Sequence, residues 1–329
     1  MSDRSRPRAA DTRTRVRRRN TAVALVLLAT AVLTSACSGG SASTAEVPGK
    51  PGQAAGAKAA LEGSAVIDRT IADYQPATDA QIPKGSTAAE IKKRGKLIVG
   101  GTRTAALFSL FDPSSEKVEG FDAALSRLLA KYIIGKPETE LVNVTATTRE
   151  ALLKNHSVDT VFATYTITDE RSKEVDFAGP YYVDGLGIQV KKTSDIAGLK
   201  DLAGKTVVTE SGSTAGTVVK DMVPNAKFQL FETNTECLQA LRQGRADAYV
   251  LDQGVLAGNA ATNPDVKVLR SMLSNEPYGI GLPLDKPDFK RFVNDWLRQI
   301  EADGTWETVW KNTIGTQVPG QAPLPPSID

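Results

Sequence analysis

Short apolar segments alternate with longer amphipathic segments through most of the chain, and this alternation limits the fold more than any other feature. In the first half, LIVGG (97–101) is typical of a buried strand, and Phe121, Leu125 and Leu129 fall on one face of a helix. Strands and helices in this order form a largely parallel sheet covered by helices. The pattern predicts helices over 89–94, 121–132 and 149–155, and strands over 96–101, 141–144 and 160–166.

A second unit of the same kind follows, and the chain then returns. Its pattern predicts strands over 205–210, 228–231 and 247–251, helices over 212–222 and 235–243, and a returning strand and helix over 278–282 and 289–303. Two such units with a return segment indicate an α/β protein of two lobes joined by more than one crossover. Ligands of open α/β sheets bind beyond the carboxyl ends of the strands, so two facing lobes present a cleft there.

The distribution of charge and the scarcity of metal-binding side chains exclude several functions. Eight of the 40 basic residues and two of the 38 acidic residues fall within 1–36, so the remaining chain is mildly acidic. An acidic body has no basic face for nucleic acid. One histidine and two cysteines leave too few ligands for a zinc site, and a catalytic triad is excluded unless it uses His156. We expect no metal and no cofactor.

The amino terminus reads as an export signal. Five arginines within 13–19 precede an apolar run over 21–33, which is too short to span a bilayer comfortably, and small residues lead to Cys37. This resembles a bacterial lipobox, although Thr34 stands where the aliphatic residue is usual. We expect 1–36 to be a lipoprotein signal peptide and Cys37 to carry lipid that anchors the protein to the outer face of the cytoplasmic membrane. The alternative is plain secretion with an incidental cysteine.

Three segments outside the lobes differ in composition. Residues 37–57 are rich in Ser, Gly and Ala and predict a flexible tether, and 58–86 an extension that is helical in part. Residues 317–329 are rich in proline and predict an irregular tail. With Cys37 acylated, Cys237 has no partner, so we expect it to be a buried free thiol.

Three features suggest a ligand with charges of both signs. Arg171 follows the strand over 160–166 and suits a carboxylate, although pairing with a neighbouring acid in its turn is equally consistent. The segment ESGSTAG (210–216) joins a strand to a helix start, where amides favour an anion, although Ser213 or Thr214 could simply cap the helix. Asp252 ends a strand and suits an ammonium group, although capping the next turn is an alternative. Together they match the zwitterion of an α-amino acid.

The motifs that carry a family resemblance run in order through most of the chain. They are GFDAALSRLLA (120–130), ATYTITDERSKEVDFAGPYY (163–182), ESGSTAG (210–216), NTECLQALRQGRADAYVLDQGVLAG (234–258), EPYGIGL (276–282) and VNDWLRQIEADGTW (293–306). The chain resembles family 3 solute-binding proteins of amino-acid ABC importers, and is most similar to the glutamate-binding lipoproteins of Gram-positive bacteria. The resemblance implies a type II periplasmic-binding-protein fold, with lobe 1 over 87–184 and 277–316, lobe 2 over 185–276, and a hinge between them.

The resemblance also implies roles for individual residues. Arg171 would bind the ligand α-carboxylate, with help from Ser213 and Thr214 of the other lobe. Thr166 would add its hydroxyl and amide, the carbonyl of Thr164 would face the ammonium, and Asp252 would take that ammonium.

Several positions depart from the family pattern or bear on specificity. Relatives commonly place a cysteine near Val208 to pair with the equivalent of Cys237, and that partner is absent here. Glu210 would repel an acidic side chain if it faced the cleft, and would then select an amide or a basic ligand. Arg103 would instead meet an acidic side chain, unless it is simply exposed. Phe108 would line the apolar wall or pack in the core.

These observations predict a monomeric binding protein and not an enzyme. It would capture a free L-amino acid, with glutamate ranked before aspartate, glutamine and asparagine, and deliver it to an ABC permease and its ATPase subunits. One alternative is a sensor subunit that signals to a membrane partner. Another is a dehydratase on the same fold, in which Glu210 or Asp252 would act as general acid.

Overall fold

The structure is a computed structural model that describes residues 51–270, 272–318 and 320–328, with side chains from Glu62 onward. The predicted signal peptide, the lipidation site Cys37 and most of the predicted tether lie outside the described residues. Within the described part of the chain, no helix is both long enough and apolar enough to cross a membrane.

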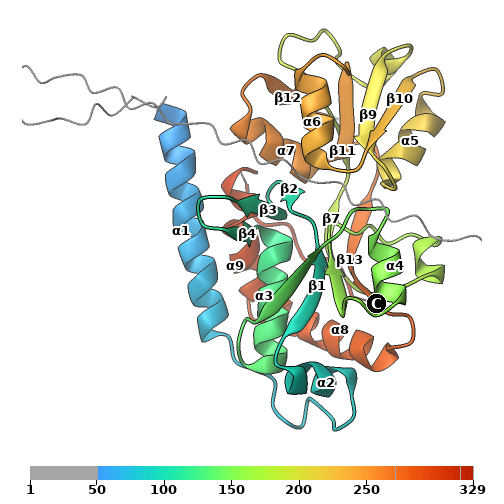
Figure 1. The fold of residues 1–329 in the computed structure, drawn as a ribbon. Coiled ribbons are helices and arrows are strands. Elements are labelled where there is room, and N and C mark those ends of the chain that lie inside the picture. The colour runs from blue at the N-terminus through green and yellow to red at the C-terminus, as the bar shows by residue number, and fades with distance from the viewer. Residues whose placement is uncertain (1–50, 271, 319, 329) are drawn as a thin grey trace, which may run out of the picture. The chain divides into compact units, whose positions relative to one another are not determined.

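Lobe 1 is built on a five-stranded mixed sheet in the order β5-β1-β6-β13-β7 (Figure 1). Strand β1 pairs in parallel with β5 and β6, whereas β13 pairs antiparallel with β6 and β7. The strands are β1 (Leu97–Gly101), β5 (Thr139–Asn143), β6 (Thr160–Phe162), β7 (Asp176–Asp184) and β13 (Glu276–Leu282). The expected parallel pairs of lobe 1 are therefore present, and the returning strand completes this sheet as an antiparallel member.

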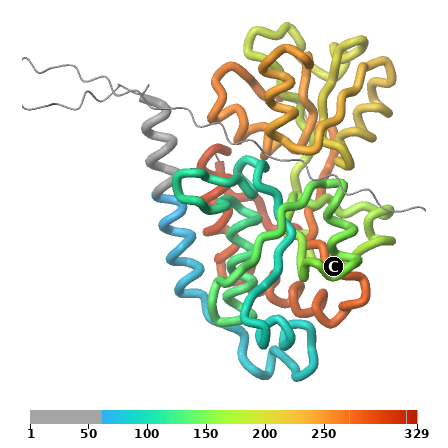
Figure 2. The backbone as a smooth tube through the Cα atoms, viewed as in Figure 1, coloured from blue at the N-terminus to red at the C-terminus, as the bar shows by residue number. Residues whose placement is uncertain are grey.

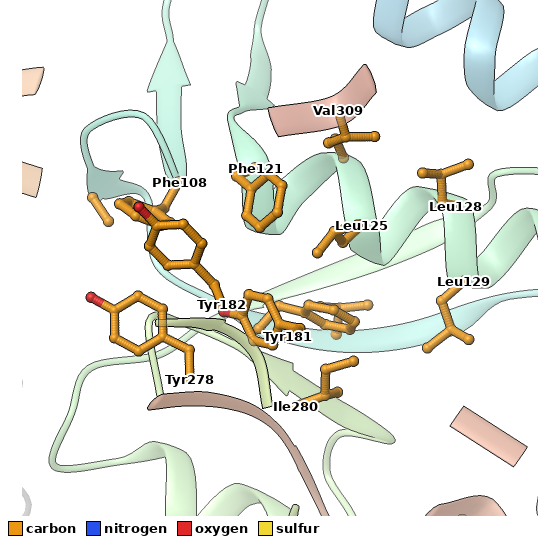
Figure 3. Close-up of a cluster of buried hydrophobic side chains, with 14 of the residues drawn as sticks. Phe108, Phe121, Leu125, Leu128, Leu129, Tyr181, Tyr182, Tyr278, Ile280 and Val309 are labelled. Carbon is orange, nitrogen blue, oxygen red and sulfur yellow. The ribbon is translucent and has the colours of Figure 1, made fainter. Parts of the chain in front are cut away.

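Helices pack on this sheet through the apolar faces that the sequence predicts. The helices of lobe 1 are α2 (Thr87–Arg94), α3 (Phe121–Ile134), α4 (Arg149–Lys154), α8 (Pro287–Ala302) and α9 (Thr305–Lys311). Phe121, Leu125 and Leu129 of α3 are fully buried. Figure 3 shows them beside aromatic rings of β7 and β13, and the Phe121 ring also meets Trp306 of α9 edge to face. Aromatic side chains are thus among the largest buried groups between helices and sheet.

Lobe 2 repeats the plan with a sheet in the order β10-β9-β11-β8-β12. Its strands are β8 (Leu186–Lys191), β9 (Thr206–Glu210), β10 (Lys227–Phe231), β11 (Ala248–Asp252) and β12 (Val266–Val268), and its helices are α5 (Thr214–Met222), α6 (Asn234–Arg242) and α7 (Gln253–Thr262). Cys237 on α6 is a buried free thiol, as the sequence predicts.

Two chain segments pass between the lobes (Figure 2). The first is Gly185, which alone separates β7 of lobe 1 from β8 of lobe 2, and the second runs from the end of β12 to the start of β13. Asp184 and Glu276, at the ends of these crossovers, are register partners in the β7–β13 ladder. The two crossovers therefore adjoin neighbouring strands, run side by side and form one hinge.

The structure differs from the sequence expectations in several places. Strands β7, β8 and β12 and helices α7 and α9 were not expected, and two of the four strand pairings in each five-stranded sheet are antiparallel, although a largely parallel sheet was predicted. Strand β6 stops at Phe162 rather than at 166, because the backbone turns at Thr164, whose φ is 42°. A small sheet formed by β2 (Thr104–Ala105), β3 (Ser109–Asp112) and β4 (Lys117–Glu119) was not expected. Helix α1 (Pro51–Asp73) begins inside the predicted tether, so residues 51–57 are helical.

Helix α1 packs on lobe 1. The body of α1 covers much of the expected extension, and buried Ile67 and Ile71 join the lobe 1 core. The described residues of the tail contain no helix or strand beyond the 3-10 turn over Ile314–Thr316.

Candidate functional site

A pocket lies between the two lobes and takes its lining from both. Lobe 1 contributes the ends of β1 and β6 and the start of α4, and lobe 2 contributes the ends of β9 and β11 and the start of α5. Every one of these is the carboxyl end of a strand or the amino end of a helix, as expected for an open α/β sheet. Of the residues predicted from the sequence, the pocket includes Thr164, Thr166, Arg171, Glu210, Ser213, Thr214 and Asp252.

Arg171 stands where the two lobes meet. Its Nη1 donates to the carbonyl oxygen of Thr166 at 2.7 Å, and its Nη2 donates to the carbonyl oxygen of Gly212 in lobe 2 at 2.9 Å. The guanidinium also lies over the Tyr165 ring, 5.2 Å from its centroid. Since a guanidinium has further N–H donors beyond these two, Arg171 can bind an anion in the pocket while it bridges the lobes.

Arg149 is a second cation in the pocket, and the sequence analysis did not identify it. It is the first residue of α4 and only 4% exposed. Its Nη1 donates to the carbonyl oxygen of Ala163 at 2.9 Å, its guanidinium lies 3.7 Å from the Tyr165 ring centroid, and its Nε has no hydrogen-bond partner among the described residues. Burial, followed by the charge of Arg171, lowers the pKa of Arg149 to about 10, so it stays charged at neutral pH.

Hydrogen bonds to Asp122 of α3 hold the turn at Thr164, which follows β6. The buried carboxylate of Asp122 accepts the backbone N–H of Thr164 and the hydroxyl of Tyr181, both at 2.8 Å. These bonds fix Thr164 in its left-handed conformation, which a non-glycine residue adopts rarely. Ala163, Thr164 and Thr166 therefore present backbone and hydroxyl groups to the pocket from one rigid turn.

The start of α5 offers free donors from lobe 2. Ser213 occupies the N-cap position, but its hydroxyl donates to the carbonyl oxygen of Glu210 at 2.7 Å and makes no side-chain cap. The hydroxyl of Thr214 donates to Glu276 in the hinge at 2.9 Å. Thr214, the first residue of this nine-residue helix, lines the pocket and no side chain caps the helix, which favours an anion there.

Asp252 brings a buried carboxyl group to the same space. It is 7% exposed, and the Tyr278 hydroxyl donates to its Oδ1 at 2.6 Å. It occupies the N-cap position of α7 without a side-chain cap, so the simple capping interpretation fails. Burial, followed by the charge of Asp184, raises the pKa of Asp252 to about 7.

Glu210 lines the pocket at the end of β9. Desolvation, followed by the negative charge of Asp252, raises the pKa of Glu210 to about 8, while Arg149 acts in the opposite direction. The pocket therefore contains two arginines, Arg149 and Arg171, and two carboxyl groups, those of Glu210 and Asp252.

Two predicted site residues do not reach the pocket. Phe108 is fully buried and packs edge to face against Tyr182 and Tyr278, with ring centroids 5.7 and 5.8 Å apart, so it belongs to the core (Figure 3). Arg103 is exposed and lies over the Phe111 ring on the outer hairpin, 4.2 Å from its centroid. Neither residue lines the pocket, although Thr102, Thr104 and Ala105, close to Arg103 in the chain, do.

Comparison with known proteins agrees with this architecture. The family model for bacterial extracellular solute-binding proteins, family 3, matches residues 97–315. A glutamine-binding protein of Geobacillus stearothermophilus is 43% identical over 198 residues, which cover 60% of this chain and 76% of the relative. The Escherichia coli (strain K12) glutamate/aspartate import solute-binding protein is 30% identical over 254 residues, which cover 72% of this chain and 84% of the relative.

Solved structures give the same fold. The ancestral amino acid-binding protein AncCDT-1, a precursor of cyclohexadienyl dehydratase, has a TM-score of 0.65 and 35% identity and covers 70% of this chain and all of that one. The cysteine-binding protein from Campylobacter jejuni has a TM-score of 0.66 and 27% identity, covering 69% of this chain and 92% of that one. The predicted two-lobed α/β fold of the type II periplasmic-binding-protein kind is thus confirmed. The chain belongs to family 3 of the bacterial extracellular solute-binding proteins, and is a binding protein and not an enzyme.

Proposed function

We propose that this protein captures an α-amino acid, glutamine in first place, and delivers it to an ABC importer. The observation that carries the proposal is the charge pattern of the pocket, with Arg171 from lobe 1 and Asp252 from lobe 2 for the two charges of the ligand backbone, and with Arg149 and Glu210 left for its side chain. The relatives named above are a glutamine-binding protein and a glutamate/aspartate import protein, and an ABC transporter glutamine-binding protein of Bacillus subtilis is 34% identical over 70% of this chain.

The two charged groups of the amino acid are bound by different sets of residues in the pocket. The ligand α-carboxylate pairs with Arg171 and accepts from the first amides of α5, which begin at Thr214. The ammonium donates to Asp252 and to the backbone carbonyl of Thr164, and Thr166 adds its hydroxyl and amide to the carboxylate. Since both lobes contribute, the ligand stabilises the closed arrangement over the open one.

The side chain distinguishes glutamine from its competitors. A carboxamide has an oxygen that accepts from Arg149 and an NH₂ that donates to Glu210, so one neutral group satisfies both. This ranking reverses the order expected from sequence resemblance, because Glu210 lines the pocket and Arg103 does not. A ligand of about ten heavy atoms needs about 0.8 kcal/mol per atom for micromolar binding, which is attainable when every charge is paired.

Glutamate is the second candidate, and a specific observation favours it. With a pKa of about 8, Glu210 is largely protonated at neutral pH. A protonated carboxyl group donates a hydrogen bond to a ligand carboxylate, and Arg149 supplies the positive charge.

A calorimetric titration of the full chain with each of the twenty amino acids tests the proposal. Glutamine should bind most tightly, glutamate next, and basic amino acids weakly because they meet Arg149. Strongest binding of a basic or apolar amino acid would contradict the assignment of Arg149 and Glu210 to the side chain.

The cellular setting is also part of the proposal. We propose that lipid on Cys37 anchors the exported monomer at the membrane, where it meets an ABC permease and its ATPase subunits. Cys37→Ala should move the protein from the membrane fraction to the medium, and continued anchoring would indicate a retained signal segment. Co-purification of permease subunits separates transport from a sensing role.

A further inference from the structure

Three carboxyl groups are buried together at the hinge. Asp184, Asp252 and Glu276 are 6%, 7% and 3% exposed, and they lie at the end of β7, the end of β11 and the start of β13. None of them takes part in an ion pair within the described part of the chain. A buried carboxylate without a cation is costly, so such a group is held by hydrogen bonds or takes up a proton.

The hydroxyl of Tyr278 joins two of these groups. It lies 2.6 Å from Oδ1 of Asp252 and 3.2 Å from Oδ2 of Asp184. A phenol has one proton and can fully satisfy one acceptor, so it cannot serve two ionised carboxylates. The phenol oxygen can form hydrogen bonds with both carboxyl groups only if one of these groups also carries a proton.

The remaining hydrogen bonds of the cluster are already made. Asp184 accepts the backbone N–H of Gly185 at 2.8 Å and that of Gly254 at 3.0 Å. Glu276 accepts the hydroxyls of Ser274 and Thr214, at 2.6 and 2.9 Å. Apart from the backbone of Asp252 itself, Tyr278 is the donor to Asp252 among the described residues, so the second carboxyl oxygen of Asp252 is available to a ligand.

The other titratable groups near the pair supply little positive charge. Besides Asp184, several titratable groups interact electrostatically with Asp252: Glu276 and Tyr278 of β13, Tyr181 of β7, Glu210 of β9, Tyr249 of β11 and Arg149 of α4. Asp184 in turn interacts with Tyr182 of β7. Arg149 is the one cation among these neighbours. Burial, the largest cause in both cases, raises the pKa of Asp184 to about 6 and that of Asp252 to about 7.

We infer that Asp252 and Asp184 share a proton through Tyr278 in the ligand-free site, and that the ammonium group of an arriving amino acid displaces this proton into the solvent. The inference rests on the proposed function, since it requires an ammonium at Asp252. The carboxyl O–H bond breaks, the proton passes to buffer, and the ammonium donates to the carboxylate left behind. Ligand capture is thereby coupled to proton release, and Tyr278 is a positioning residue that holds Asp252 ready for the exchange.

The direction of the pH effect follows from this exchange. Below the pKa of Asp252 the ligand must displace a proton, so affinity falls as pH falls, whereas above it the carboxylate is already free. With a pKa of about 7, glutamine should bind about tenfold more weakly at about pH 6 than at about pH 8.

The test is calorimetry of the full chain with glutamine in buffers of different ionisation enthalpy, which counts the protons released. About one proton per ligand is expected at about pH 6 and much less at about pH 8.5. Tyr278→Phe keeps the ring in its aromatic cluster but removes the donor that favours the ionised Asp252. It should weaken binding several-fold at neutral pH, shift the affinity profile to higher pH, and leave affinity at about pH 8.5 near the original value.

Two further variants make the result specific. Tyr132→Phe removes a hydroxyl that contacts Gln81 and Gln299, away from the pocket, and should retain the original profile. Glu210→Gln should still release the proton at about pH 6, and loss of the release would assign the proton to Glu210 and overturn the inference.

The remaining outcomes separate this inference from the proposed function. Binding of glutamine with no proton release at about pH 6 would overturn the coupling and leave the proposed function standing. A Tyr278→Phe variant that is weakened equally at every pH would show a purely structural role for the hydroxyl and overturn its assignment. Absence of binding by any amino acid at any pH would contradict the proposed function itself.

Discussion

The guanidinium of Arg149 donates a 2.9 Å hydrogen bond to the carbonyl oxygen of Ala163, which fixes a buried cation at the wall of the ligand pocket. A positive charge in the first turn of a helix opposes the helix dipole, and burial adds a further cost. A folded protein retains such a residue where another contribution offsets the cost. In the proposed function that contribution is recognition of the ligand side chain.

Replacement of Arg149 by Met should therefore affect ligand affinity. A hydrogen bond from a charged group contributes about 1.5–3 kcal/mol, so glutamine affinity should fall roughly tenfold to a hundredfold. Calorimetry measures this directly. Lys154→Met, at the exposed end of the same helix, is the matched control and should bind normally. Unchanged affinity in Arg149→Met would remove Arg149 from the site.

Replacement of Arg171 by Lys should weaken every amino acid alike. The planar guanidinium of Arg171 binds the carbonyl oxygens of Thr166 and Gly212 and still has donors for a carboxylate. A lysine ammonium cannot reproduce this geometry, so the affinity should drop by about tenfold or more. Titration with glutamine and glutamate shows whether both fall by the same factor. A loss confined to one of them would place Arg171 on the side chain rather than on the α-carboxylate.

Replacement of Glu210 by Gln should alter the pH dependence of glutamate binding. Because the pKa of Glu210 is about 8, the group is neutral at about pH 7 and becomes an anion as pH rises through 8. The ratio of glutamate affinity to glutamine affinity should then decline between about pH 7 and 8.5 in the original chain and stay flat in the variant. Identical profiles for the two chains would mean that Glu210 does not meet the ligand side chain.

Replacement of Phe108 by Ala should lower stability rather than change specificity. Removing a fully buried ring costs about 3–5 kcal/mol in the free energy of unfolding, which denaturant titration measures. Leu110→Ala, in the same hairpin and 42% exposed, should change it by no more than about 0.5 kcal/mol. If the variant kept its stability but bound the amino acids in a different order of affinity, Phe108 would contact the ligand and the assignment to the core would be wrong.

Most of the fold and much of the site could be predicted from the sequence because both depend on local signals. Apolar periodicity located most helices and the strands β1, β5, β9, β10, β11 and β13, but not β7 and β8. Glu210 and Asp252 lie at the carboxyl ends of strands, and Arg171 lies in the turn that follows β6. Thr164 and Thr166 followed from the same motif as Arg171, and Ser213 and Thr214 from the start of α5.

Arg149 was missed because an arginine beside a glutamate at a helix start resembles an exposed pair. Only the packing of α4 against the turn after β6 buries it. A signal was nevertheless present, since Arg149 follows the strand over 139–143 and so shares the carboxyl edge of the sheet with Arg171. For Arg103 and Phe108 the sequence left two interpretations open, and the structure shows an exposed arginine and a core phenylalanine, because only tertiary packing decides which side chains face the pocket.

The structure of the chain bound to glutamine tests the central claim most directly. It should show the α-carboxylate on Arg171, the ammonium on Asp252, the amide oxygen about 3 Å from Arg149 and the amide nitrogen about 3 Å from Glu210. A ligand whose side chain points away from Arg149 and Glu210, or whose ammonium avoids Asp252, would contradict it.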